Sequence, residues 1–530
     1  MTSKFLRRFR IIFSSLILIS FILVFIDFRN IIPPDYINYL LYLQFIPSIL
    51  KYLSIESILG AGFIAILVLT LLTGRTYCSF FCPLGIGQDL FSRIGGRFRR
   101  KFRRYGFKKP HTILRYLLLA ITLTVTLLWG IYLITLLDPY SIFGRFMTYF
   151  GKPAAIVVNN FVAGILGKFD IYTLNHITVK PFALLAYSIP FVFFLLTGIL
   201  SFTKGRLYCN TFCPVGTLLG LISKVSFLRI KFDESSCSRC GRCSIGCKSS
   251  CIDFLKHDID VSRCVGCFNC INSCPDKAIS YGIVNFKRKK KVEFVKPKET
   301  EEAPDTNRRK IIAGSVLFML GMSGYLKAQE KSIPKPTEDS TVKENRKFPV
   351  CPPGGGSLED FNKHCIACSL CITACPNLVL QPSIREYGLA GMMQPVMDYH
   401  KSFCTYNCTV CTEICPTQAL KPLMLDAKKL TQLGKAIFIK DNCIVKTEKT
   451  ACGACSESCP TKAVHMIPYE GNLLIPEVKD DICIGCGHCE FACPTTPFKA
   501  IFVDGNAIHI AAKKPENVQS DMKTPAEFPF

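Results

Sequence analysis

The 530-residue sequence lacks the motifs of several common redox cofactors. It has no Cys-x-x-Cys-His motif, which excludes covalently attached c-type haem. The only histidines near its apolar segments, His111 and His176, lie at opposite edges and do not make a bis-histidine haem b site. No Gly-x-Gly-x-x-Gly motif links a strand to a helix, so there is no sign of a nicotinamide site. The chain therefore contains no obvious hydride carrier.

Acidic residues are scarce, at 39 against 64 lysines and arginines, which gives a net charge of +25. Residues 1–350 hold 48 basic and 21 acidic residues, whereas residues 351–510 hold 13 and 15. The hydrophobic content of 49% excludes a disordered chain. Nucleic-acid binding needs a basic face on a soluble fold. Here much of the positive charge flanks apolar runs, so a nucleic-acid partner is excluded.

Thirty cysteines are too few for a disulfide scaffold of this length, since such scaffolds are short and exceed roughly 8–10% cysteine. The thiols are therefore expected to bind a cofactor.

A length of 530 residues also predicts about three to four structural units at roughly 150 residues per domain.

Four apolar runs, at residues 11–26, 58–72, 117–137 and 182–202, approach the roughly 20 residues that a membrane helix needs. Buried core helices are the alternative. Basic residues crowd residues 4–10 and 93–115, which places these segments in the cytoplasm, with 27–55 and 138–180 outside. The predicted fold class is a membrane α-helical bundle, built as a duplicated helical hairpin of four spans, with α+β ferredoxin-like domains.

A fifth apolar run, residues 311–326, follows Arg308, Arg309 and Lys310. It is either a fifth span or a buried or interfacial helix, and the arginine pair is either a positive-inside flank or a twin-arginine export signal. If it spans, everything after Lys327 lies outside. The predicted divisions are a membrane domain (1–225), a cytoplasmic two-cluster ferredoxin (226–286), a linker (287–307), the fifth segment (308–327), a linker (328–350), a four-cluster ferredoxin (351–510) and a tail (511–530).

The membrane part contains an internal repeat. Residues 74–85, GRTYCSFFCPLG, recur as residues 205–216, GRLYCNTFCPVG. Each copy places two cysteines at i and i+4, on one helical face, before a proline that stops or kinks the helix. Cys78, Cys82, Cys209 and Cys213 could therefore meet as a metal or iron–sulfur site. A redox-active dithiol and purely structural cysteines are the alternatives.

Two tandem Cys-x2-Cys-x2-Cys-x3-Cys motifs follow, typical of a two-cluster ferredoxin in which the fourth cysteine of each motif ligates the other cluster. The first predicted [4Fe-4S] site is Cys237, Cys240, Cys243 and Cys274, and the second is Cys264, Cys267, Cys270 and Cys247. Lys248 replaces the proline usual after the first motif. Cys251 is then either the true fourth ligand or a spare buried thiol.

Four further motifs follow the linker, which makes six predicted [4Fe-4S] clusters. They are Cys365, Cys368, Cys371 and Cys375; Cys404, Cys408, Cys411 and Cys415; Cys443, Cys452, Cys455 and Cys459; and Cys483, Cys486, Cys489 and Cys493. A zinc site is the alternative. Zinc ribbons pair two Cys-x-x-Cys knuckles around one ion and lack cysteine triplets closed by Cys-Pro, so the spacing does not indicate zinc. Cys351 is left over and is not expected to be a ligand.

At these motifs the chain resembles the NapH and NapG ferredoxin-type proteins of periplasmic nitrate reductase systems, fused head to tail. Residues 1–290 resemble NapH, and residues 305–510, with the twin arginine and the Pro352-Pro353-Gly354 stretch, resemble NapG. The resemblance implies a protein of the bacterial cytoplasmic membrane that oxidises membrane quinol and delivers electrons to a periplasmic reductase. It also suggests nested ligand sharing in the outer domain, motif one with four and two with three, although the spacing is equally consistent with sequential pairing.

The quinol site is predicted at the outer segment from Asp138 to Arg145, where a carboxylate could take the quinol proton. A helix cap is the alternative role for Asp138. Electrons must then cross a hydrocarbon layer about 30 Å thick, either by a relay at the repeat cysteines or by quinone coupling two separate circuits. Two other functions stay open: ferredoxin–quinone transfer in the reverse direction, and a metal-handling or cofactor-assembly factor for a respiratory enzyme.

Overall fold

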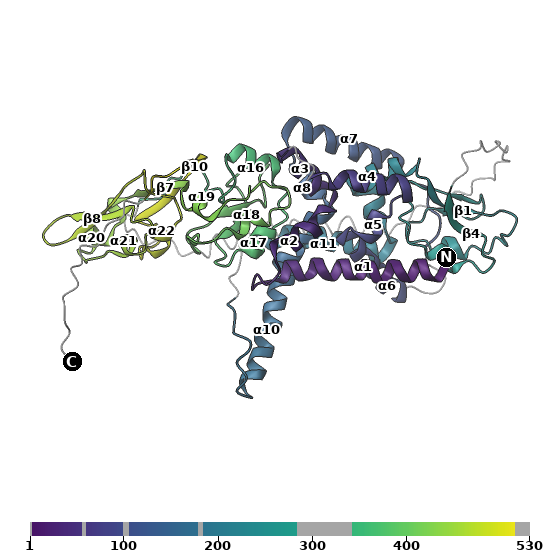
Figure 1. The fold of residues 1–530 in the computed structure, drawn as a ribbon, viewed down its shortest axis with the longest axis horizontal. Helices are drawn as coiled ribbons and strands as arrows, with labels where there is room; N and C mark the ends of the chain where they lie inside the picture. Colours follow the sequence, from purple (N-terminus) through teal and green to yellow (C-terminus); the bar gives the residue numbers. More distant parts are fainter. Residues whose placement is uncertain (1–2, 56–59, 99–104, 179–183, 284–341, 515–530) are drawn as a thin grey trace, which may run out of the picture.

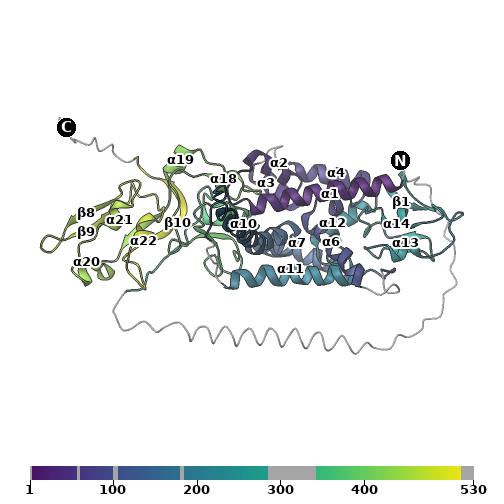
Figure 2. The ribbon, with the colours of Figure 1, turned by 90° about the horizontal axis from the view of Figure 1, so that it is seen from below.

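The computed structural model describes residues 3–55, 60–98, 105–178, 184–283 and 342–514. Figures 1 and 2 show three bodies in a row. The helical domain (residues 3–223) lies in the middle, the N-terminal ferredoxin (residues 226–283) at one end and the C-terminal polyferredoxin (residues 342–514) at the other. The two ferredoxin parts therefore lie at opposite ends of the helices. The predicted linker 287–307 and fifth segment 308–327, with Arg308 and Arg309, fall outside the described residues.

Prolines begin several elements of the helical domain, because the fixed φ of proline suits the first helical turn. Its α-helices are α1 (Ser3–Ile26), α2 (Pro34–Tyr42), α3 (Phe45–Ile55), α4 (Gly62–Thr73), α5 (Tyr77–Phe80), α6 (Pro83–Phe98), α7 (Thr112–Trp129), α8 (Tyr132–Leu137), α9 (Pro139–Phe146), α10 (Lys152–Gly167), α11 (Leu184–Lys204) and α12 (Pro214–Ser223). Two π-helical turns, η2 (Met147–Gly151) and η3 (Tyr208–Phe212), interrupt them.

Three helical stretches of the described chain are long and apolar enough to cross a membrane: Phe5–Ile26, Pro139–Gly167 and Leu184–Lys204. The first and last correspond to predicted spans. In the described part of the run at 58–72 the helix is the 12-residue α4, which is shorter than a span. At its first residue, Gly62 packs against the backbone of Tyr42, where a Cβ would lie 1.9 Å from the carbonyl oxygen. The run at 117–137 breaks at Gly130, whose φ is +94°. The prediction of four uninterrupted spans is thus not confirmed.

The segment 138–180, predicted as an outer connection, is largely helical. Its first helix, α9, is buried inside the helical domain. Figure 1 shows that α10 runs across the direction of α1 and α11 and projects sideways, and it exposes Val157, Val158 and Phe161. This segment therefore forms part of the core at one end and an apolar arm at the other.

The two repeats pack crosswise. Helix α6 of the first repeat packs on α11, which leads into the second, and α12 of the second repeat packs on α4, which leads into the first. The Asp89 carboxylate of α6 is buried at the junction and pairs with Arg10 at 2.6 Å, Arg206 at 2.9 Å and Lys248 at 3.4 Å. A buried charge is tolerated only when it is paired. The three ion pairs of Asp89 therefore link α1, the second repeat and the N-terminal ferredoxin to the first repeat.

The N-terminal ferredoxin is closed by one antiparallel pair, β1 (Leu228–Phe232) with β4 (Ile279–Ile283), in which Leu228 faces Ile283. Between them lie a small pair, β2 (Ile252–Asp253) and β3 (Asp258–Ile259), and the short helices α13 (Arg242–Ile245) and α14 (Asn269–Ser273). Cysteine loops make up most of the rest. The two outer strands thus hold the ends of both cysteine motifs together.

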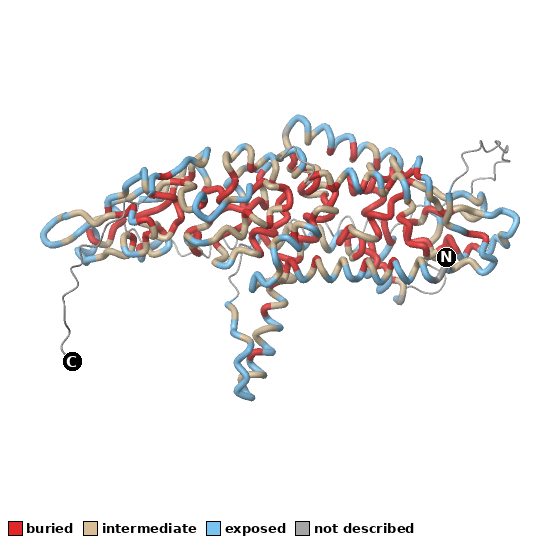
Figure 3. Tube along the Cα trace, viewed as in Figure 1, coloured by how far each residue is buried: buried red, intermediate tan, exposed pale blue. Residues whose placement is uncertain are grey.

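The C-terminal polyferredoxin has two halves and two clusters of buried residues, and buried segments, red in Figure 3, run through both halves. The first half contains α16 (Leu358–His364), α17 (Leu370–Ala374), α18 (Val410–Glu413), α19 (Leu425–Lys429) and the pair β5 (Leu380–Pro382) with β6 (Pro395–Met397). The second contains η4 (Lys440–Asn442), α20 (Ile444–Thr447), α21 (Ala454–Glu457), α22 (His488–Ala492) and the pair β8 (Val464–Pro468) with β9 (Leu474–Val478). The pair β7 (Thr431–Phe438) with β10 (Ile501–Ala511) joins them.

This domain begins earlier than the predicted residue 351. Asn442 binds both the N–H and the carbonyl of Val342, and the Asp504 carboxylate accepts hydrogen bonds from the N–H groups of Lys347 and Phe348. The last residues of the predicted linker are thus part of the folded domain.

Candidate electron-transfer centres

The four repeat cysteines, Cys78, Cys82, Cys209 and Cys213, are brought together in the core of the helical domain. Each is 2–3% exposed. Cys82 and Cys213 directly precede α6 and α12, and their Sγ atoms accept hydrogen bonds from the N–H groups of Gly85 and Gly216 at 3.4 and 3.3 Å. Helix N-termini favour negative charge, so this geometry suits thiolates.

Two buried arginines connect the repeats reciprocally. Arg75 of the first repeat donates to the Cys209 carbonyl at 3.0 Å, and Arg206 of the second donates to the Cys78 carbonyl at 2.7 Å. Arg75 Nη2 also lies 3.8 Å from Cys78 Sγ. Neither arginine was predicted from the sequence, although the Gly-Arg pair recurs in the two copies. Four thiols with fixed N–H donors and cations around them match the needs of an anionic thiolate-held centre.

In the N-terminal ferredoxin, Cys247 lies beside Cys267 and Cys270, as the shared-ligand pattern predicts. Cys251 lies in the same place, with its Sγ 3.5 Å from that of Cys247, and it also neighbours Cys264. Five thiols therefore meet at the second predicted cluster. At the first predicted cluster, Cys237, Cys240 and Cys243 are neighbours. A hydrogen bond from Ser238 to the Asp276 carboxylate holds the segment after Cys274 close to these three cysteines.

The second ferredoxin motif docks directly on the first repeat. Arg75 Nη1 donates to the Ser262 carbonyl at 2.8 Å, and Ser79 Oγ donates to the Val265 carbonyl at 2.8 Å. Gly266 has a φ of +62° and fits against Thr76, so a Cβ there would lie 2.9 Å from the Thr76 methyl group. Cys267 consequently belongs to the same buried core as the repeat cysteines.

The C-terminal cysteines pair sequentially, and the nested sharing is wrong. Cys415 joins Cys365, Cys368 and Cys371, while Cys375 joins Cys404, Cys408 and Cys411. Cys493 joins Cys443, Cys452 and Cys455 around one pocket, and Cys459 joins Cys483, Cys486 and Cys489. In each motif a one-turn helix ends at or just before the Cys-Pro pair, and the chain that follows turns toward the adjacent motif. Because this connecting segment is short, the last cysteine of each motif lies beside the adjacent motif and cannot reach a motif at the other end of the domain.

Cys351, the predicted non-ligand, is fully buried beside the side chain of Tyr387. Burial raises the pKa of its thiol. Cys351 stays a predicted non-ligand, since burial raises the pKa of predicted ligands such as Cys365 and Cys371 as well.

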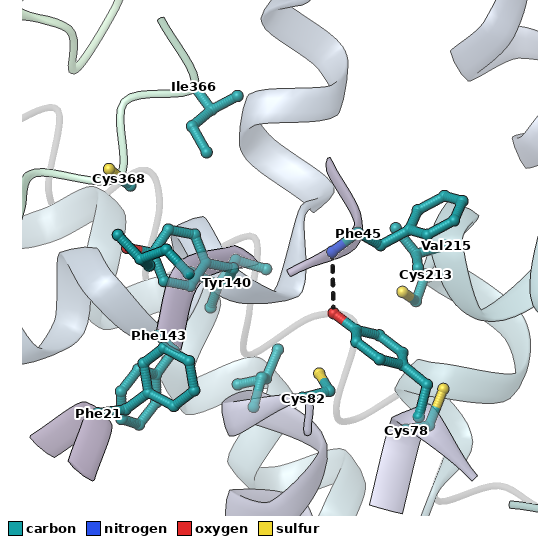
Figure 4. Packing of buried hydrophobic residues seen from close by; sticks show 14 of the residues in the cluster. Phe21, Phe45, Cys78, Cys82, Tyr140, Phe143, Cys213, Val215, Ile366 and Cys368 are labelled. Carbon is teal, nitrogen blue, oxygen red and sulfur yellow. Dashed lines mark hydrogen bonds between the residues drawn. The ribbon is translucent and has the colours of Figure 1, made fainter. Parts of the chain in front are cut away.

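The first C-terminal motif docks on the helical domain. The Thr373 hydroxyl donates to the Phe25 carbonyl at 2.9 Å, and the Thr148 hydroxyl donates to the Ser369 carbonyl at 3.3 Å. Gly144 of α9 meets the motif so closely that a Cβ would lie 2.5 Å from the Cys368 carbonyl. Figure 4 shows Cys368 and Tyr140 near one another in the core that also contains Cys82 and Cys213.

Asp138 and Arg145 lie inside this junction, at 2% and 1% exposure. Asp138 caps α9 by accepting the Ser141 N–H at 2.8 Å, which is the cap role left open by the sequence. Arg145 donates to the Thr135 carbonyl at 2.7 Å. Asp138 is an electrostatic neighbour of Tyr208 on one side and of Cys368 on the other. These residues fill the space between the repeat cysteines and the first C-terminal motif.

Comparison with known proteins supports iron–sulfur binding at two of these places. A family model described as a 4Fe-4S binding domain matches residues 58–104 and 185–233, which include all four repeat cysteines. A 4Fe-4S dicluster domain model matches residues 450–496, which include the fourth C-terminal motif and most of the third. The repeat thus lies within the segments that match a 4Fe-4S binding domain.

Three curated relatives are ferredoxin-type proteins. The chain is 26% identical over 188 residues to NapH of Escherichia coli, covering 34% of this chain and 50% of NapH. It is 28% identical over 196 residues to the methylamine utilization protein MauN of Paracoccus denitrificans, covering 36% and 54%. It is 31% identical over 146 residues to MauM of Methylobacillus flagellatus, covering 25% and 59%.

The chain is similar to NapH-like ferredoxin proteins. The match spans only 50–59% of the length of these three relatives. No solved structure matches the chain. The predicted resemblance to NapH-like ferredoxin proteins is thus confirmed at modest identity.

Proposed function

We propose that this chain conducts electrons across the bacterial cytoplasmic membrane, from membrane quinol at the helical domain to a periplasmic reductase or carrier at the C-terminal polyferredoxin. [4Fe-4S] clusters at the six ferredoxin-type cysteine sets, and an iron–sulfur centre at the repeat cysteines, would each accept and release one electron at a time. The residues of the chain hold these sets in order and exclude water between them.

The observation that supports this function is the shared buried core of Cys82, Cys213, Cys267 and Cys368. It joins the N-terminal ferredoxin, the repeat cysteines and the first C-terminal motif. The sets continue outward in sequence: Cys371 neighbours Cys411 of the second set, and the Cys404 N–H donates to the Cys486 carbonyl of the fourth at 3.0 Å. The roughly 30 Å hydrocarbon layer that separates the two ferredoxin parts is thereby divided into shorter steps. A relay is favoured over two separate circuits.

A buried serine in place of a repeat cysteine tests the relay. In the full chain with its clusters, reduced naphthoquinol should reduce the C-terminal clusters, and Cys213→Ser should abolish this while dithionite still reduces them. Cys351→Ser is the matched control, since Cys351 is equally buried and lies near Cys365 but is not one of the predicted ligands. Normal quinol-driven reduction in Cys213→Ser would contradict the relay. Midpoint potentials of the N-terminal clusters far below that of quinone would instead indicate flow from ferredoxin to quinone.

A further inference from the structure

An apolar groove opens where α1 meets the N-terminal ferredoxin. Six aromatic rings line it: Phe9, Phe13, Phe80, Phe81, Phe268 and Tyr281. Phe9 and Phe13 come from the candidate span Phe5–Ile26, so the groove is open to the bilayer that this helix would cross. We propose that this aromatic groove binds the head group of the membrane quinone, an inference that rests on the proposed function.

The rings are arranged for a flat aromatic ligand. The Phe13 ring packs edge-on against Phe81 with centroids 5.5 Å apart and lies 5.9 Å from the Phe80 ring, while Phe9 and Phe13 stack at 6.0 Å. On the opposite wall Phe268 and Tyr281 meet edge-on at 5.2 Å. Aromatic pairs prefer such stacked and edge-on geometries, which a quinone ring can extend. A lipid acyl chain would gain nothing specific from them.

The groove also has hydroxyl oxygens that can accept hydrogen bonds from the O–H groups of a quinol. The Thr73 and Thr76 hydroxyls lie 2.7 Å apart and share one hydrogen bond, and the Tyr281 hydroxyl donates to the Thr73 carbonyl at 3.2 Å. Each hydroxyl oxygen retains acceptor capacity for a quinol O–H. Three hydroxyls in an otherwise apolar groove are typical of sites that bury an apolar ligand and orient it with a few polar contacts.

Two cysteine sets flank the groove directly. Phe80 and Phe81 lie between Cys78 and Cys82 in the first repeat, and Phe268 lies between Cys267 and Cys270 in the second ferredoxin motif. A bound quinol would therefore sit between two one-electron acceptors. In the proposed step both O–H bonds of the quinol break, its two protons pass to water at the ferredoxin end of the groove, and its two electrons reduce two iron–sulfur centres by one electron each. The quinone leaves through the bilayer side.

This location replaces the site predicted at Asp138 and Arg145, which the fold seals in the interior. The aromatic groove had no signal in the sequence, because its walls come from α1, the first repeat and the ferredoxin. Only the folded chain brings these segments together.

The test is photolabelling of the full-length protein in lipid nanodiscs with an azido-naphthoquinone that carries an isoprenoid tail. We expect label on peptides that contain Phe9, Phe80 or Phe268, displaced by excess unmodified quinone. Phe9→Ala should weaken quinone binding about two- to tenfold, the contribution of one aromatic pair. Phe5→Ala is the matched control, because Phe5 lies one turn earlier on α1 with the same 51% exposure and does not line the groove.

The outcomes separate this site from the function on which it rests. Label outside the groove, label that quinone does not displace, or equal affinities of Phe9→Ala and Phe5→Ala would overturn the groove, even if quinol still reduces the clusters. Displaceable groove labelling without any reduction of wild-type clusters by quinol would instead overturn quinol oxidation as the function.

Discussion

Arg75 donates a hydrogen bond from Nη2 to the carbonyl oxygen of Cys209, in the other repeat, at 3.0 Å. The same guanidinium reaches Asn210 and the Ser262 carbonyl, so it ties both repeats to the N-terminal ferredoxin. No acidic partner of Arg75 is found among the described residues, in contrast to Arg206, which pairs with Asp89. Arg75 is therefore a positive charge placed beside the repeat thiols.

We expect Arg75→Met to lower the midpoint potential of the repeat centre by on the order of tens of millivolts, because charge and hydrogen bonding around the sulfurs set such potentials. Arg75→Lys should retain part of the charge effect but lose the hydrogen-bond fork that joins the repeats. A redox titration followed by electron paramagnetic resonance measures both. Lys224→Met, an equal change of charge at an exposed position, should leave the potential unchanged.

A side chain at Gly144 should separate the C-terminal polyferredoxin from the helices. In Gly144→Val the new Cβ would collide with the Cys368 carbonyl and with the Phe25 ring, at 2.5 and 2.7 Å. We expect unchanged iron content but slower electron passage from the repeat centre to the C-terminal clusters, because the first C-terminal motif must move away from the helices to make room for the side chain. Stopped-flow absorbance gives the rate. Gly164→Val on α10, where nothing lies within 4 Å, should behave as wild type.

The His488 ring lies within hydrogen-bond distance of a ligand of one predicted cluster, and its Nδ1–H tautomer would donate to that sulfur. Its Nδ1 lies 3.2 Å from Cys486 Sγ. Burial, with a smaller effect of Lys428, lowers the pKa of His488 to about 4, so the imidazole is neutral near pH 7. His488→Phe keeps the ring against Phe403 but removes the donor, and the potential of this cluster should fall by on the order of tens of millivolts. An equal shift in His509→Phe, whose ring has no sulfur partner, would show that the effect is not the hydrogen bond.

His400 should make the C-terminal polyferredoxin slightly less stable at alkaline pH. The hydrogen bond that His400 donates to the Glu344 carboxylate raises the pKa of His400 despite partial burial, and Glu490 and Arg346 also face it. A raised pKa means that the stabilisation is complete below the unfolded value of about 6.5 and is lost as the pH rises through the folded value. The effect should stay below about 1 kcal/mol because the side chain is 45% exposed.

Thermal unfolding of the domain at pH 5.5 and 8.5 measures this difference, which His400→Gln should remove. His176→Gln, at an exposed histidine of the helical domain, serves as the control.

The Glu344, His400 and Glu490 cluster also has the composition of a cation site. Arg346 already donates to both carboxylates, at 3.0 and 2.5 Å, and supplies the positive charge there.

Local spacing predicted the cysteine sets because one short loop must provide three of the ligands. Predictions that depended on distant segments fared less well. The nested pairing of C-terminal motifs was wrong because the segment after each Cys-Pro pair is short and leads to the adjacent motif. The predicted helix at 117–137 is interrupted because Gly130 takes a positive φ, which a hydropathy pattern does not indicate. The reciprocal arginines could have been found from the repeated Gly-Arg pair, whereas the aromatic groove depends on three segments that meet only in the fold.

The arrangement of the three bodies in a row has an electrical consequence. Once the helices span the membrane, an electron that passes from the N-terminal ferredoxin to the C-terminal polyferredoxin moves through the transmembrane voltage. Each elementary charge that crosses the full voltage changes in energy by about 2.3 kcal/mol per 100 mV. The interior of an energised cell is negative, so outward transfer is assisted and inward transfer is opposed. Under the proposed function, the energised state of the membrane therefore favours electron flow from the N-terminal ferredoxin to the C-terminal polyferredoxin.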